Sequence, residues 1–338
     1  MRLDVGRVSA SKGCADYKLL FIMRKANKQN LSFTTVSLLQ IGPDQEGQRV
    51  DNYLFRIGKG VPKSHIYKAI RSGQVRVNGG RVRHDYRLAL DDELRIPPLR
   101  APDPTSKQAA PPAQFPVVYE DDVLLAINKP AGVAVHGGSG VSFGVIEQLR
   151  AAQPEHSYLE LVHRLDRDTS GLLLVAKRRR ALVGLQEAFR KAQIERHYVA
   201  LVVGDWVNDR QHLRQPLLRW TTASGERRVR VDDDGKRAHT IITLKKRFGR
   251  FSLLSAELRT GRTHQIRVHL ANQGYKIVGD DKYGRDDINQ EMARLGFKRM
   301  FLHAARLAFQ HPLSERHIML EAPLDESCQQ LLTYLENT

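Results

Sequence analysis

Residues 116–338 contain a series of short apolar runs of strand length, separated by polar turns, and this spacing constrains the fold more than any other feature. Few helical patterns lie between the runs. An amphipathic pattern at 182–192 and the tail from Asp325 each predict a helix. Many strands with few helices between them favour a mixed, mostly antiparallel sheet with flanking helices, of α+β class. Strands are expected near 123–127, 172–176, 198–203, 239–246, 251–258, 264–270, 301–309 and 316–321.

Residues 101–115 are typical of a linker, because four prolines lie there among Ala, Ser and Gln. The domains predicted on either side are a small one at 47–100 and a large one at 116–338. Residues 1–46 are basic and weakly periodic, so a poorly ordered extension is expected there. Within it, Met23 is a second candidate start.

The small domain predicts two helices followed by a hairpin. Asp51 and Asn52 are suited to capping the first helix, and Pro62 opens the second, which Ser72-Gly73 ends. The Asn78-Gly79 pair is a strong two-residue hairpin signal. Strand alternation around that turn, at 75–77 and 81–83, places the valines inward and Arg76 outward.

Positive charge is concentrated in this small domain, where twelve Lys and Arg face five Asp and Glu. One exposed basic face is suited to phosphate contacts, although such faces can also be merely solvated. The order of helix, helix and hairpin with this charge resembles the S-four-type RNA-binding domain. The expected RNA-binding residues are Arg49, Lys63, Lys68, Arg71, Arg76, Arg81 and Arg83.

The whole chain is also basic, with 54 Lys and Arg against 37 Asp and Glu and a net charge of +17. A charge of this sign and size favours nucleic acid as a partner over a membrane surface. Cys14 and Cys328 form no Cys-x-x-Cys pair, and the apolar run at 19–23 is too short to span a bilayer. A cytoplasmic protein is expected. No phosphate-binding glycine motif predicts a nucleotide cofactor.

The densest group of chemically capable residues is HRLDRDTSG at 163–171. A strand enters, a polar loop follows and a strand leaves. Two carboxylates, Asp166 and Asp168, lie among arginines that favour their ionised form. An ionised carboxylate can act as nucleophile or base. Physical reasoning alone leaves a catalytic loop and a surface loop with paired charges equally open.

Two other segments stand out. TGRTHQIRVH at 260–269 reads as a strand in which Arg267 shares one face with Gln265, and a buried arginine there requires an acidic partner. RHYVAL at 196–201 places Tyr198 at the start of a strand, where a tyrosine is more often part of a core or sheet edge than of a site.

The run at 163–171 resembles the signature of the RluA-type pseudouridine synthase family in full, and the segments at 196–200 and 260–269 resemble two further motifs of that family. Agreement extends to NKPAG at 128–132 with VH at 135–136, and to GD at 279–280 with YG at 283–284. Together these segments cover nearly all of the large domain in the family's order. The segments at 60–64, 135–140 and 142–147 are most similar to members that modify large-subunit ribosomal RNA.

The resemblance implies a role for individual residues. Asp166 would be the catalytic aspartate, Arg267 would hold it ionised, and Tyr198 would stack on the target base. Ile266 would pack near that base, and Arg164 would enter the helix where the nucleotide flips out. The substrate-binding set implied is Arg164, Ile266, Lys129 and His163.

The resemblance also implies the reaction. Uridine becomes pseudouridine when the bond from C1′ to N1 breaks, the uracil turns and C1′ joins C5. This requires an extruded base, because the atoms are inaccessible in a stacked helix. No metal or other cofactor is expected. The expected partner is large-subunit ribosomal RNA or its assembly precursor, with the protein as a monomer.

Three alternatives remain open from the sequence. The first is a glycosidic hydrolase that uses Asp166 and Asp168 as an acid–base pair. The second is an RNA-binding assembly factor without catalytic activity. The third is a metal site built from His163, His264 and His269, which is disfavoured because 264 and 269 point to opposite faces of a strand.

Overall fold

The computed structural model describes residues 35–58, 60–99, 110–138, 141–156, 158–223 and 225–338. The chain divides into two compact units, Met1–Lys107 and Gln108–Thr338. The division falls inside the predicted linker.

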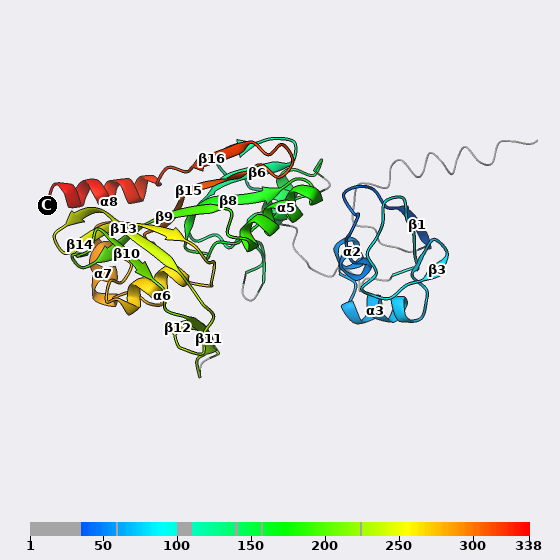
Figure 1. The fold of residues 1–338 in the computed structure, drawn as a ribbon, viewed down its shortest axis with the longest axis horizontal. Helices are drawn as coiled ribbons and strands as arrows, with labels where there is room; N and C mark the ends of the chain where they lie inside the picture. Colours follow the sequence, from blue (N-terminus) through cyan, green and yellow to red (C-terminus); the bar gives the residue numbers. More distant parts are fainter. Residues whose placement is uncertain (1–34, 59, 100–109, 139–140, 157, 224) are drawn as a thin grey trace, which may run out of the picture. The chain divides into compact units, whose positions relative to one another are not determined.

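The small unit combines a four-stranded sheet with two helices (Figure 1). The sheet has the order β1-β4-β2-β3, with antiparallel pairing throughout the described strands. Its apolar core includes Leu54 and Ile66 from the helices and Leu94 from the sheet, all fully buried. The elements are β1 (Ser37–Gln40), α2 (Val50–Ile57), α3 (Lys63–Arg71), β2 (Arg76–Val77), β3 (Gly80–Arg81) and β4 (Glu93–Ile96).

The predicted helices and hairpin of the small unit are confirmed. Asn78 and Gly79 both have positive φ, 50° and 76°, as a tight hairpin turn of this type requires. Val75 and Val77 are buried while Arg76 is exposed. The return strand is shorter than expected and ends at Arg81.

Two expectations for the small unit need correction. Asp51 does not cap α2: the N-cap is Arg49, and the buried Asp51 carboxylate lies in the first turn, where it accepts hydrogen bonds from Arg49. Residues 37–40, expected within the extension, form β1 and pair with β4, because the edge of β4 offers backbone partners. Residues 35–36 and 41–46 of the expected extension are also described, and Ile41 is fully buried in the core of this unit. Residues 1–34 lie outside the described residues.

The large unit is built on a ten-stranded sheet. Eight of these strands follow the order β10-β13-β14-β9-β15-β8-β6-β5, and the other two, β16 and β7, pair with β15 and β8. Among the described strands, β15 pairs parallel with β8 and the other pairings are antiparallel, which confirms the mixed, mostly antiparallel α+β prediction. The strands are β5 (Val117–Glu120), β6 (Leu124–Lys129), β7 (Glu160–Leu161), β8 (Ser170–Ala176), β9 (Glu195–Val203), β10 (Arg210–Leu213), β13 (Thr240–Phe248), β14 (Phe251–Leu258), β15 (Leu302–Gln310) and β16 (His317–Glu321).

Helices cover both faces of this sheet. The even-numbered side chains of β9, such as Tyr198 and Ala200, join the largest apolar cluster, whereas Leu201 faces the cluster that holds α8. This alternation separates a site face from a back face. The helices are α4 (Val145–Ala152), α5 (Arg179–Arg190), α6 (Gln265–Asn272), α7 (Asp286–Arg294) and α8 (Glu326–Glu336). Asp325 caps α8 and thus confirms the helix expected at the tail.

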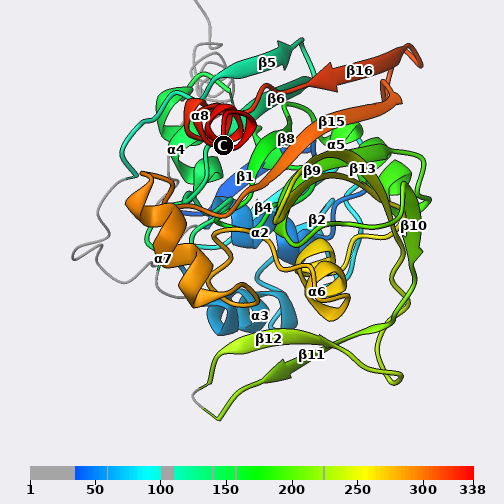
Figure 2. The same ribbon diagram turned by 90° about the vertical axis from the view of Figure 1, so that its left-hand side faces the viewer.

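The strand expected at 264–270 is wrong, because Gln265–Asn272 forms helix α6, which lies within the curve of β13 (Figure 2). Every residue from Gln265 to Leu270 is buried, polar ones included. A helix buried on all sides has no polar face from which to read its period, and Ile266, Val268 and Leu270 happen to alternate as in a strand. Tertiary packing therefore decided this element.

A separate hairpin, β11 (Leu217–Thr221) with β12 (Arg227–Val231), extends from the large unit near α6 (Figure 2). Its base packs through Leu217 and Val229 against Val268 of α6. The sequence patterns did not predict this hairpin. It attaches a basic ribbon directly to the helix that carries Arg267.

Candidate active site

The HRLD run lies on the loop between β7 and β8, as expected. Asp166 exposes 25% of its side chain, so the carboxylate can be reached from solvent. Its Oδ2 atom lies 3.6 Å from Arg267 Nη1 and 3.9 Å from His264 Nε2. The loop closes on itself where Thr169 N–H donates to the Asp166 carbonyl at 3.2 Å. A reachable carboxylate thus faces two nitrogen-bearing side chains from α6 and its N-cap.

Arg267 is 2% exposed and its strongest partner is Asp280 rather than Asp166. Nε and Nη2 donate to the two Asp280 oxygens at 2.7 and 2.6 Å, and Nη2 also contacts Asp281 at 3.2 Å. Burial acts to lower the pKa of Arg267, but the hydrogen bond and charge of Asp280, with Asp166 and Asp281, outweigh it and raise that pKa. The guanidinium is therefore a permanent cation with its Nη1 atom directed to Asp166.

Tyr198 lies on β9, on the same face as the largest apolar cluster, which also contains Ile266 of α6. Burial raises the pKa of Tyr198 to about 12, with Arg196 opposing and Asp166 adding to the effect. The phenol is therefore neutral at physiological pH. Tyr198 and Ile266 share this cluster with Leu165, the residue before Asp166.

Lys129 and His163 have internal partners. Lys129 is fully buried, and its Nζ donates to the carbonyl oxygens of Pro130, Val133 and Arg167 at 2.8, 2.9 and 3.0 Å. Burial lowers the pKa of Lys129 to about 7. These bonds tie the catalytic loop to the end of β6, which favours support of the loop over direct contact with substrate.

His163 faces the α5 side of the loop. Its Nε2 accepts a hydrogen bond from Leu174 N–H at 3.1 Å, and its ring packs against Phe189 with centroids 4.9 Å apart. Burial lowers the pKa of His163 to about 4, so the ring is neutral. These contacts favour a role in holding the loop. Arg164, by contrast, is exposed and available to a large ligand.

In the small unit, six of the seven expected RNA-binding residues are exposed: Lys63, Lys68, Arg71, Arg76, Arg81 and Arg83. Arg49 is half-buried and bound to Asp51 at 2.6 Å, so much of its donor capacity is already used. Asp85 lies 3.3 Å from Arg83. The exposed basic side chains come from α3 and the β2–β3 hairpin.

Sequence reasoning missed three contributors. Asp280 lay in a matched segment without an assigned role, and His264 was considered only as a ligand in the disfavoured metal-site alternative. The third is the β11–β12 hairpin, whose Trp220 is 38% exposed and lies 5.9 Å from the Arg230 guanidinium. The alternation of arginine and valine in RRVRV of β12 was the sequence signal that could have predicted this strand. The further arginines of the hairpin are Arg219, Arg227 and Arg228.

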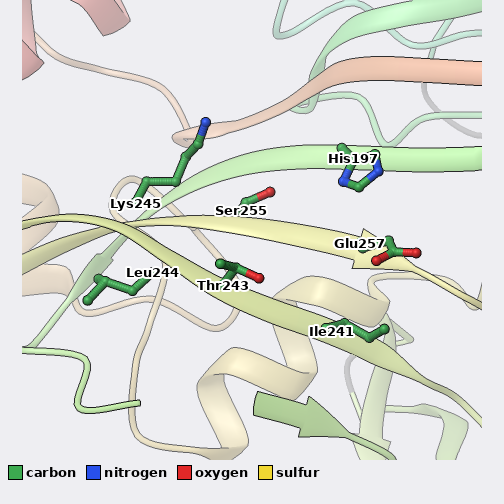
Figure 3. Close-up of a pocket in the computed structure, with 7 residues that line it drawn as sticks. All are labelled: His197, Ile241, Thr243, Leu244, Lys245, Ser255 and Glu257. Carbon is green, nitrogen blue, oxygen red and sulfur yellow. The ribbon is translucent and has the colours of Figure 1, made fainter. Parts of the chain in front are cut away.

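A hollow on the large sheet lies away from the residues around Asp166 (Figure 3). His197 lines it, next in sequence to Tyr198 but on the opposite face of β9 because strand side chains alternate. Thr243, Ser255 and Glu257 from β13 and β14 complete most of its polar lining. The hollow is thus on the back face and is not part of the site around Asp166.

Comparison with known proteins gives two family matches, an S4 domain at residues 48–94 and RNA pseudouridylate synthase at residues 123–272. The ribosomal large subunit pseudouridine synthase C of Pasteurella multocida (strain Pm70) is 45% identical over 92% of this chain and 97% of its own. The protein of the same name from Escherichia coli (strain K12) is 46% identical over 90% of this chain and 98% of its own. The chain belongs to the RNA pseudouridylate synthase family.

Solved structures agree at the level of the fold. Human RNA pseudouridylate synthase domain containing 1 has a TM-score of 0.53 at 24% identity, over 67% of this chain and 96% of that one. Human RNA pseudouridylate synthase domain containing 4 has a TM-score of 0.54 at 24% identity, over 65% and 93%. The family matches and the curated relatives confirm the predicted family, enzyme class and RNA-binding domain type.

For this pseudouridine synthase, the alternative sites predicted from the sequence find no support in the geometry. Asp168 binds Arg167 at 3.1 Å, whereas Asp166 faces Arg267 and His264, so the two carboxylates have different partners. Within the described ranges, no cluster of His, Cys, Asp or Glu could hold a metal ion. The same part of the chain holds no helix long and apolar enough to cross a membrane.

Proposed function

We propose that this protein converts uridine to pseudouridine in large-subunit ribosomal RNA, with Asp166 as the catalytic residue. The observation that supports it most directly is the convergence of Arg267 and His264 on one oxygen of a reachable Asp166 carboxylate. Relatives named for this substrate, similar along nearly their whole length, support the choice of RNA.

The site has what the isomerisation demands. An ionised carboxylate is needed whether Asp166 attacks C1′ or removes the C2′ proton, and Arg267 Nη1 lies 3.6 Å from this carboxylate as a counter-charge. Unstacking the target base costs a few kcal/mol. Stacking on Tyr198, worth roughly 1–3 kcal/mol in comparable sites, offsets that cost. Ile266 would pack beside the same base, and Arg164 would occupy the space that the base leaves.

RNA would be held by charges on both units. The exposed residues Lys63, Lys68 and Arg71 on α3 would contact phosphates, as would the arginines of the β11–β12 hairpin. Trp220 offers an exposed ring on which an unpaired base can stack. Acting on ribosomal RNA would place the protein in the cytoplasm, and no step requires a second copy or a cofactor.

The test compares two neighbouring carboxylates. Asp166→Asn should abolish pseudouridine formation in transcribed large-subunit ribosomal RNA, with RNA affinity retained. Asp168→Asn is the matched control, because Asp168 contacts Arg167 rather than the Arg267 side, and it should stay active. Pseudouridine at wild-type levels in the Asp166→Asn reaction would contradict the role of Asp166, whereas no pseudouridine in the wild-type reaction would favour an RNA-binding assembly factor.

A further inference from the structure

A chain of polar contacts leads from the β11–β12 hairpin to the Asp166 carboxylate. Val229 N–H on β12 donates to Tyr283 Oη at 3.0 Å, and that oxygen lies 2.9 Å from His264 Nδ1. The other ring nitrogen, His264 Nε2, lies 3.9 Å from Asp166 Oδ2. The imidazole therefore turns one nitrogen to the tyrosine and the other to the carboxylate.

The hydrogen bonds around Tyr283 favour one position of the imidazole proton. A backbone amide can only donate, so the Tyr283 oxygen accepts from Val229. Within the described part of the chain, the acceptor found for the Tyr283 hydroxyl proton is His264 Nδ1. A neutral imidazole that accepts at Nδ1 carries its proton on Nε2, which faces Asp166. Burial lowers the pKa of His264, the Asp166 charge opposes this, and Arg267 adds to it.

Both contacts to the carboxylate fall on the same atom. Arg267 Nη1 and His264 Nε2 each approach Oδ2, at 3.6 and 3.9 Å. A separation of 3.9 Å is longer than a hydrogen bond. Catalytic hydrogen bonds are often long in a substrate-free enzyme and shorten in the complex. Two donors on Oδ2 would fix the orientation of the Asp166 carboxylate.

We infer that His264 is a positioning residue for Asp166, held by Tyr283 in the tautomer that donates from Nε2. The inference rests on the proposed function, since it assigns a partner to the carboxylate proposed to act on uridine. It also connects the basic hairpin to the catalytic carboxylate through Val229 and Tyr283.

The backbone of His264 allows the donor to be tested separately from the fold. Its φ of 53° and ψ of 22° lie in the left-handed region, which asparagine tolerates better than most residues. The asparagine amide reaches the position of Nδ1 but not that of Nε2. Glutamine places a nitrogen near Nε2, although its side chain has less preference for this backbone conformation.

The experiment compares His264→Asn with His264→Gln for kcat and KM on transcribed large-subunit ribosomal RNA and for thermal stability. His264→Asn should lower kcat about tenfold or more with KM unchanged and no loss of stability, because it lacks the donor to a charged group. His264→Gln should retain more of kcat despite a lower Tm. A wild-type kcat in His264→Asn would overturn the inference, as would losses of kcat that follow the losses of stability.

Tyr283→Phe provides a second test. It removes the hydroxyl that selects the tautomer but keeps the ring over the Arg267 guanidinium, whose central carbon lies 5.2 Å from the ring centroid. We expect kcat to fall several-fold with KM unchanged. Tyr275→Phe is the control, because that hydroxyl donates to the Asp205 carbonyl at 3.2 Å. Equal kcat in both variants would contradict the role of Tyr283.

The outcomes separate the inference from the proposed function. A wild-type protein that forms no pseudouridine would refute the proposed function. An active wild type and an inactive Asp166→Asn protein, with His264→Asn as active as wild type, would refute only the role of His264.

Discussion

Replacing Asp280 by asparagine removes the main partner of Arg267 without changing the size of the side chain. The Asp280 carboxylate is 1% exposed and accepts from Arg267 Nε and Nη2 and from the backbone N–H groups of Lys282 and Tyr283. In Asp280→Asn, an amide NH₂ group meets some of these donors, and a buried cation loses its neutralising charge. Breaking a buried ion pair in this way costs about 3–5 kcal/mol.

That cost should be visible as a lower melting temperature of the large unit. At about 2–4 °C per kcal/mol for a unit of this size, the Tm should fall by roughly 6–20 °C. Trp206 and Trp220 are the two tryptophans of the chain and both belong to Gln108–Thr338, so tryptophan fluorescence follows this unit alone. The kcat should fall more than KM rises, because Arg267 loses the partner that directs Nη1 to Asp166.

Asp281→Asn is the matched control. Asp281 lies 3.2 Å from the same Arg267 Nη2 atom, but 58% of its side chain is exposed, and exposed pairs contribute about 0–1 kcal/mol. Its Tm should change by no more than about 4 °C. Equal changes in the two variants would refute the reasoning that burial, rather than the number of charges around Arg267, determines the cost.

Three further outcomes are expected. Burial acts to raise the pKa of Asp280, but Arg267 outweighs it and holds that pKa below 3.8. The stabilisation by the Asp280–Arg267 pair is therefore full above pH 3.8 and is lost as the pH falls through the pKa of Asp280 in the folded state. Acid titration of unfolding should thus bring the stabilities of wild type and Asp280→Asn together below that pKa. Gly171→Ala should destabilise the large unit by more than about 3 kcal/mol or prevent its folding, since φ is 106° and a Cβ would lie 2.3 Å from the Ala304 carbonyl oxygen; a near-normal denaturant midpoint would contradict this. The triple substitution Lys63→Ala, Lys68→Ala and Arg71→Ala should reduce the slope of log K for RNA against log salt by roughly 2–3, with kcat unchanged at saturation; an unchanged slope would argue against phosphate contacts from α3.

Much of the local structure follows from the sequence because its causes are local. The Asn78-Gly79 turn formed since both residues accept positive φ, and the apolar runs of β6, β8 and β9 became strands since their side chains fill a sheet core. The motif order predicted the family, and that resemblance implied the role of Asp166, which its loop between two strands had left open. These features need only the residues themselves and their immediate neighbours.

Other features depended on packing between distant segments. The segment after His264 is helix α6, and its pattern was misread because the segment is buried on every side, where alternation of apolar residues carries no information about period. Sequence reasoning paired Arg267 with Asp166, yet the fold gives its two best bonds to Asp280 and directs one remaining nitrogen to Asp166. Lys129, read as a substrate contact, is enclosed by three carbonyl groups.

The sequence by itself determined which chemistry the chain can carry: an ionised carboxylate, a cation, an aromatic ring and a strongly basic surface. Only the tertiary structure decided which of these groups meet. Asp166 and Arg267 lie on different elements about a hundred residues apart, and no local rule relates their side chains. Burial then selected the pairings, because a buried charge must find its partner wherever the fold places it.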